Sequence, residues 1–279
     1  MKNFVVIVNL SLSLILLSNA KNIFAQTTAP VKLTQLQYAK LNAVLVIGSS
    51  TEIDSSVINL GKYLRGLGVN VFEFYHPNAI WDNIISIGVP IHIFVYRGHG
   101  TLLGVDNTPG GLAISSPEFI SSKVISKDLP LAKNALILFQ SVCFAAGSSA
   151  SDNSNIPLNT AIFRVENYAK SFIEKGAAAY YAVNFTNALK PFLEDFFKGL
   201  PAIEIYKQNY SQWCKIQTTQ CYSFDRLYQV SIADQMPTSP ATRTTKVNGK
   251  TVTKKVGPFL SYEKAFVGKP DFSVMDFFK

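Results

Sequence analysis

The sequence predicts an α/β fold in which helices flank a mainly parallel central sheet. Short apolar runs alternate along the chain with segments whose apolar residues recur at helical spacing, an order typical of β–α–β units. The apolar runs are continuous, as expected for strands that are buried on both faces. The chain has 279 residues, 48% of them hydrophobic and 16% charged, which suffices for one large buried core.

The elements of this core are expected between residues 43 and 212. The predicted strands are residues 43–50, 69–75, 91–96, 134–140 and 177–183. The first helix is expected to begin after Asp54 or Ser55, either of which can cap it, and to end at Gly66 or Gly68. The spacing of apolar residues predicts further helices over residues 79–88, 117–125, 162–172 and 189–200.

The last part of the chain, residues 213–279, has a different pattern. The dipeptide Asn248-Gly249 lies between two β-prone runs and predicts a tight hairpin. We therefore expect a β-rich C-terminal extension that packs on the core and either completes one edge of the sheet or caps it.

The first 25 residues have the layout of a secretory signal peptide. Lys2 is followed by an apolar run over residues 4–17, and small residues precede two candidate cleavage points, after Ala20 and after Ala25. The run is shorter than the roughly 18 apolar residues that a spanning helix needs. We expect a secreted or periplasmic protein with no membrane association after signal cleavage, and a linker or short pro-segment over residues 26–42.

The three cysteines suggest one disulfide and one free thiol. Cys214 and Cys221 bracket a short polar stretch, and an exported chain meets oxidising conditions, so we expect these two to be bridged. Cys143 is then left over, which suggests a chemical role for its thiol.

Charge and histidine content argue against two classes of partner. The formal net charge of +8 comes without an arginine-rich run, so no nucleic-acid partner is expected. The three histidines are scattered and have no metal-ligand spacing, so no metal or other cofactor is expected.

A histidine and a cysteine follow two of the predicted strands. His99 comes shortly after the strand over 91–96, and Cys143 shortly after the strand over 134–140. Because parallel strands end at one edge of a sheet, an imidazole base and a thiol nucleophile are expected to share a crevice there. The glycine after the histidine, Gly100, lets the backbone approach a substrate, and the N–H groups of Gly100 and Cys143 are candidate oxyanion donors.

These two segments resemble the catalytic blocks of a peptidase family. Tyr-Arg-Gly-His-Gly at 96–100 resembles the Tyr-Ser-Gly-His-Gly block of metacaspases, and Ser-Val-Cys-Phe-Ala-Ala-Gly at 141–147 resembles their Asp-x-Cys-x-Ser-Gly block. The order of the elements is similar to that of the wider caspase, legumain, clostripain and gingipain clan. Residues 192–206 resemble a helix of the related CHAT domains, and residues 265–274 faintly resemble their terminal strand.

The resemblance implies a caspase-like three-layer sandwich and a secreted cysteine endopeptidase. It implies His99 as general acid/base, Cys143 as nucleophile, and Gly100 with Cys143 as oxyanion donors. The substrate would be a protein or peptide, cleaved through an acyl-enzyme without a metal at the reacting centre.

One departure from the metacaspase pattern concerns substrate choice. Metacaspases have an acidic residue two positions before the cysteine that helps to hold a basic substrate side chain, and Ser141 stands there in this chain. Asn184, just after the strand over 177–183, is expected to line the same pocket as Ser141. Three acidic residues could supply the missing charge: Asp106, Asp152 or Glu166.

Two alternative functions follow from the same residues. The serine at position 141 also fits a catalytically inactive caspase-like module that binds peptides or acts as a scaffold. A cysteine amidotransferase is disfavoured, because in those enzymes the cysteine precedes the histidine and here no histidine follows Cys143. Residues 147–159 are either a substrate-rim or processing loop, or a plain solvated loop.

Overall fold

The computed structural model describes most of the chain from residue 32 onward. The described residues are 32–49, 55–100, 110–117, 119–152, 154–209, 216–221, 230–237, 241–247, 250–256 and 259–279. The predicted signal peptide lies outside these residues, as do Asp106 and Cys214. Cys221 belongs to a described strand, but its side chain is not described, so the predicted disulfide stays a prediction.

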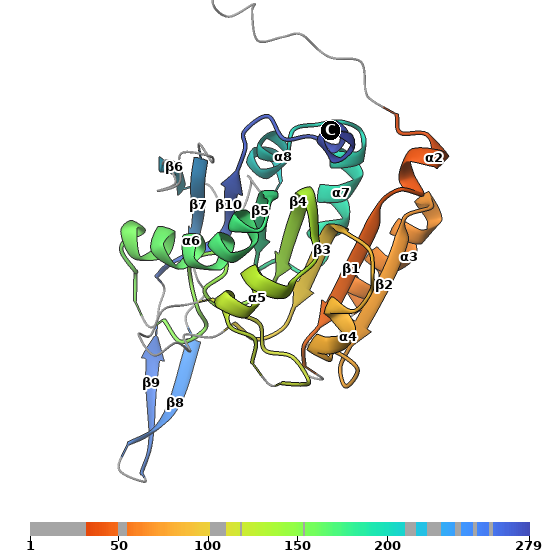
Figure 1. Ribbon diagram of the computed structural model, residues 1–279. Helices are drawn as coiled ribbons and strands as arrows, with labels where there is room; N and C mark the ends of the chain where they lie inside the picture. The colour runs from red at the N-terminus through yellow and green to blue at the C-terminus, as the bar shows by residue number, and fades with distance from the viewer. Residues whose placement is uncertain are drawn as a thin grey trace, which may run out of the picture. The chain divides into compact units, whose positions relative to one another are not determined.

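Five parallel strands form one side of the sheet, as the continuous apolar runs predict (Figure 1). All four pairings among them are parallel. In spatial order the strands are β2 (Asn70–Tyr75), β1 (Asn42–Ile47), β3 (Ile91–Arg97), β4 (Leu131–Gln140) and β5 (Ala177–Val183).

The C-terminal extension continues the sheet beyond β5 with antiparallel strands, which is one of the two arrangements expected. The next strands are β10 (Leu260–Gly268), β7 (Val230–Pro237) and β6 (Ile216–Cys221), and they complete an eight-stranded mixed sheet. Outside this sheet, β8 (Ala241–Val247) and β9 (Lys250–Val256) pair as a hairpin in which Val247 lies opposite Lys250. The hairpin predicted around Asn248-Gly249 is therefore confirmed.

Helices cover both faces of the sheet and make it the middle of three layers (Figure 1). One face carries α3 (Ser55–Leu67), α7 (Leu189–Phe197) and α8 (Ala202–Gln208). The other carries α4 (Trp81–Ile85), α5 (Ser122–Asp128) and α6 (Leu158–Glu174). Within the described residues, no helix is both long and apolar enough to cross a membrane.

Aromatic side chains fill the space between the layers. On the α6 face, the ring of Phe139 lies 5.2 Å from that of Tyr96 and 5.5 Å from that of Phe172. On the opposite face, Tyr181 stacks on Phe192 with ring centroids 4.5 Å apart. Each such pair stabilises the fold by about 0.5–1.5 kcal/mol beyond the burial of its surface. This packing holds β3, β4 and β5 rigidly at the edge from which the site is built.

Two expectations about individual elements need correction. Residues expected to be linker form the short helix α2 (Gln35–Tyr38), in which Thr34 and Gln37 make a capping box, and β1 already begins at Asn42. The helix expected over 189–200 is α7, which ends at Phe197 because Gly199 has a φ of +94°, and a second helix that was not predicted from the sequence, α8, follows from Ala202. The capping box at Thr34 stabilises α2, and the left-handed backbone of Gly199 ends α7.

Candidate functional site

The site lies at the carboxyl edge of the parallel strands. Arg97, Gln140 and Val183 are the last residues of β3, β4 and β5, and they lie opposite one another in register. His99 follows β3 by two residues and Cys143 follows β4 by three, so neighbouring strands deliver both segments to the same edge.

The backbone around His99 is held by Tyr96. The buried Tyr96 hydroxyl lies 2.9 Å from the carbonyl oxygen of His99 and 2.8 Å from that of Ala113, and it accepts a hydrogen bond from the Ala113 N–H at 3.0 Å. One buried hydroxyl therefore fixes the turn after β3 against residues 110–114. The side chain of His99 is exposed.

The histidine and cysteine segments touch through their backbones. A methyl group added at Gly100 would overlap the carbonyl oxygen of Cys143 and lie 2.7 Å from the hydroxyl oxygen of Tyr168. Only a residue without a side chain allows this approach. The structure therefore brings the two predicted segments together, as their places after neighbouring strands lead us to expect.

The segment that carries Cys143, residues 141–152, is here called the cysteine loop. Ser141 has a φ of 54° and Phe144 a φ of 69°, so two residues without the freedom of glycine adopt the left-handed region on either side of Cys143. Such backbone persists only where surrounding contacts over-determine it, and it is enriched at functional sites. The Cys143 thiol is free and half-buried.

Hydrogen bonds hold the cysteine loop on several sides. The Phe144 N–H donates to the Ser148 carbonyl at 2.7 Å, and the Tyr262 N–H donates to Ser148 Oγ, also at 2.7 Å. The Tyr180 hydroxyl donates to the Ala145 carbonyl at 3.0 Å. Burial raises the pKa of Tyr180 well above its ordinary 10.0, so this hydroxyl keeps its proton.

Two backbone donors near the thiol have no acceptor among the described residues. The N–H groups of Gly100 and Cys143 donate no hydrogen bond in the part of the chain that the structure describes. N–H groups that are available to donate, on two segments in contact, can stabilise negative charge that develops on the carbonyl oxygen of a bound substrate.

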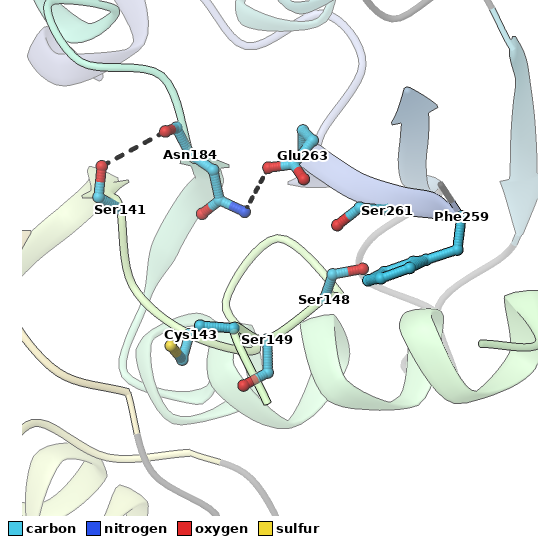
Figure 2. A pocket seen from close by; sticks show the side chains of 9 residues that line it. Ser141, Cys143, Ser148, Ser149, Asn184, Phe259, Ser261 and Glu263 are labelled. Carbon is cyan, nitrogen blue, oxygen red and sulfur yellow. Dashed lines mark hydrogen bonds between the residues drawn. The ribbon is translucent and has the colours of Figure 1, made fainter. Parts of the chain in front are cut away.

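A pocket of about 320 Å³ opens beside Cys143. Figure 2 shows Asn184 between Ser141 and Glu263 on one side of it, with Cys143 and Ser149 on the cysteine loop. Asn184 Nδ2 donates to Glu263 Oε2 at 2.8 Å, and Ser141 Oγ donates to the Asn184 carbonyl at 3.4 Å. The lining residues are Ser141, Cys143, Ser148, Ser149, Ala150, Asn184, Phe259, Ser261 and Glu263.

Glu263 is the single charged residue among those described as lining the pocket. It lies on β10, which runs antiparallel to β5 and pairs Lys264 with Val183, so the beginning of β10 reaches the edge where β5 ends. A β-bulge interrupts the pairing of β10 with β7 at Glu263, and the next residue, Lys264, is only 1% exposed and donates to the Tyr206 carbonyl at 2.7 Å. The pocket is therefore acidic although a lysine follows Glu263 directly.

The structure distributes the expected pocket residues differently from the sequence prediction. Ser141 and Asn184 line the pocket as expected. Asp152 is bound to Arg164 and Glu166 is half-buried on α6, and neither is among the lining residues. The acidic side chain that lines the pocket is Glu263, and neither Asp152 nor Glu166 takes that place. Two polar residues of β10, Ser261 and Glu263, line the pocket. The sequence shows them two positions apart, but this spacing indicates a pocket only once the position of β10 in the sheet is known.

No group of three or more His, Cys, Asp or Glu residues within the described ranges could hold a metal ion.

Comparisons with known proteins do not assign the chain to a family. No protein-family model matches the sequence, and no curated protein matches it significantly. Function must therefore be inferred from the site.

Proposed function

We propose that the protein is a caspase-like cysteine endopeptidase in which His99 and Cys143 form a catalytic dyad. The observation that carries the proposal is the backbone contact between Gly100 and Cys143 at the carboxyl edge of the parallel strands, beside an open pocket. The order of histidine before cysteine on neighbouring strands also supports the metacaspase resemblance.

In the proposed reaction the imidazole of His99 takes the thiol proton of Cys143. The thiolate then attacks the carbonyl carbon of the scissile peptide bond and forms a tetrahedral intermediate. The negative oxygen accepts hydrogen bonds from the N–H groups of Gly100 and Cys143. As the C–N bond breaks, the imidazolium protonates the leaving amine, and a thioester remains on Cys143.

Water completes the cycle. His99 takes a proton from a water molecule, whose oxygen attacks the thioester carbonyl. The second tetrahedral intermediate collapses, the C–S bond breaks, and the sulfur leaves as thiolate and recovers a proton from the imidazolium. The carboxylic acid product leaves, and both side chains return to their starting state.

We propose that the pocket takes a cationic side chain of the residue whose carbonyl is attacked, the P1 residue. Glu263 supplies a half-buried carboxylate, oriented by Asn184, in a pocket whose other described lining residues are uncharged. A charge-assisted hydrogen bond to this carboxylate is stronger than a neutral one. Ser141 therefore does not argue against basic substrates, because the acid comes from another strand.

The test is cleavage of fluorogenic peptides that differ only at P1, by the purified chain and by Cys143→Ala and His99→Gln variants. We expect cleavage after Lys or Arg by the wild type alone, and stoichiometric alkylation of Cys143 by iodoacetamide at neutral pH. Absence of cleavage, or cleavage that survives Cys143→Ala, would refute the dyad. Peptide that binds without hydrolysis, equally well to Cys143→Ala, would indicate the inactive peptide-binding module.

We also propose that the protein is exported, on the layout of residues 1–25 alone. N-terminal sequencing of the mature chain, taken from the medium or periplasm of the expressing cell, tests this. Sequence beginning at Lys21 or Gln26 is expected, and an intact Met1 would contradict export with cleavage.

A further inference from the structure

Arg164, on α6, forms an ion pair with Asp152 of the cysteine loop. Its Nη1 lies 2.8 Å from Asp152 Oδ2 and its Nη2 lies 3.1 Å from Asp152 Oδ1, a two-pronged ion pair. Nη1 also donates to the carbonyl oxygen of Gly147 at 3.1 Å. One guanidinium thus joins the middle of the loop, at Gly147, to its end, at Asp152.

The ion pair is largely shielded from solvent and is extended by further contacts within the loop. The side chains of Arg164 and Asp152 are only 13% and 9% exposed. Asp152 Oδ2 also accepts a hydrogen bond from the Ser149 N–H at 2.8 Å. On its other side, the guanidinium lies over the ring of Phe144, 4.9 Å from the centroid.

These contacts end on residues that shape the site. Phe144 directly follows Cys143 and has a left-handed backbone, which the contact with Arg164 helps to hold. Ser149 lines the pocket, and its backbone is fixed through Asp152. Loss of the guanidinium would release both sides of the thiol at once.

We propose that Arg164 is a positioning residue, which acts through Asp152, Gly147 and Phe144 to hold the cysteine loop in the conformation that presents Cys143. The inference rests on the proposed role of Cys143 as nucleophile. Its consequence for regulation is that the pocket wall is assembled in the intact chain, without prior cleavage of the loop. A lysine could not replace the arginine fully, because a single ammonium lacks the planar fork that spans both carboxylate oxygens.

The decisive experiment compares Arg164→Met, Arg164→Lys and Asp152→Asn with the wild type. Arg65→Met is the matched control, because Arg65 forms an ion pair of 3.0 Å with Glu73 but is 45% exposed and lies on a helix of the opposite face. Three properties are measured on each full-length protein: hydrogen exchange of the amides in residues 144–152, the rate of Cys143 alkylation by iodoacetamide, and steady-state peptide cleavage.

We expect Arg164→Met to exchange the Ser149 amide about 10-fold faster or more, because removing one partner of a buried ion pair strongly destabilises its surroundings. A displaced nucleophile lowers kcat by about 10²-fold, with a smaller change in KM. Arg164→Lys should show smaller changes in Ser149 amide exchange and in kcat than Arg164→Met. Arg65→Met should change neither the exchange rate nor kcat.

Wild-type exchange, alkylation and kcat in a folded Arg164→Met variant would overturn the proposal. If that variant does not fold, wild-type values in both Arg164→Lys and Asp152→Asn would overturn it equally. A wild type that cleaves no peptide would refute the endopeptidase, but the exchange and alkylation rates would still show whether Arg164 holds the cysteine loop.

Discussion

Replacing Gly100 by alanine tests the contact on which the proposed dyad depends. The added methyl group would overlap the carbonyl oxygen of Cys143, and Tyr168 leaves no room on the other side. The second obstacle belongs to a well-packed part of the fold, since Tyr168 is 1% exposed. The overlap can be relieved only if the His99 and Cys143 segments separate by about 1 Å, a displacement that costs an enzyme on the order of 10²-fold in rate.

The stability cost of the same substitution is smaller than its effect on activity. Overpacking of this kind costs about 1–3 kcal/mol. In a chain of this size each kcal/mol lowers Tm by about 2–4 °C, so the variant is expected to fold. Gly66→Ala is the matched control, because Gly66 lies in α3 with nothing within 4 Å of an added methyl group.

The assays are peptide cleavage, alkylation of Cys143 by iodoacetamide, and thermal unfolding. We expect Gly100→Ala to lose about two orders of magnitude in kcat/KM and to alkylate at an altered rate, while Gly66→Ala keeps both and gains slightly in stability. Wild-type kcat/KM in Gly100→Ala would mean that the two segments need not touch for the chemistry, and the dyad argument would fail.

Three further outcomes are expected. Glu263→Gln should lower kcat/KM about 10-fold or more for peptides with Lys or Arg at P1, by loss of a charged hydrogen bond, and should spare peptides with Leu at P1; an equal loss for both would exclude a specificity role. Tyr96→Phe removes the hydroxyl that lies against the part-buried carbonyls of His99 and Ala113 and accepts from the Ala113 N–H, so urea unfolding should show a loss of about 1–3 kcal/mol in the free energy of unfolding, and unchanged stability would contradict the role assigned to the hydroxyl. Burial lowers the pKa of His92 below its ordinary 6.5, so the folded state binds a proton less readily than the unfolded chain; Tm should fall as the pH falls below about 6.5, and less so in His92→Gln.

The half of the site that the sequence predicted depends on local signals. Continuous apolar runs predict parallel strands, and parallel strands end at one edge, so the approach of the segments that carry His99 and Cys143 follows from two motifs and one topological rule. Ser141 and Asn184 follow by the same reasoning, since each comes directly after such a strand. None of these inferences requires knowing which side chains pack together.

The other half depends on pairings that are distant in the chain. Glu263 reaches the site only because β10 pairs antiparallel with β5, about eighty positions earlier in the sequence, and no local pattern states that pairing. Asp152 was a reasonable candidate for the pocket charge by proximity to Cys143. Its ion pair with Arg164 on α6, twelve positions later, removes it from the pocket.

The parallel strand β4 and the antiparallel strand β10 contribute different parts of the site. The cysteine loop turns sharply after a parallel strand, and contacts from outside the loop help to hold its left-handed residues in place. The antiparallel strand β10 both closes the pocket with Glu263 and donates the Tyr262 N–H to Ser148 of the cysteine loop. Adjacent residues of β10 thus set both the charge of the pocket and the geometry of the cysteine loop, so in the proposed enzyme a shift in the register of β10 is expected to change specificity and rate together.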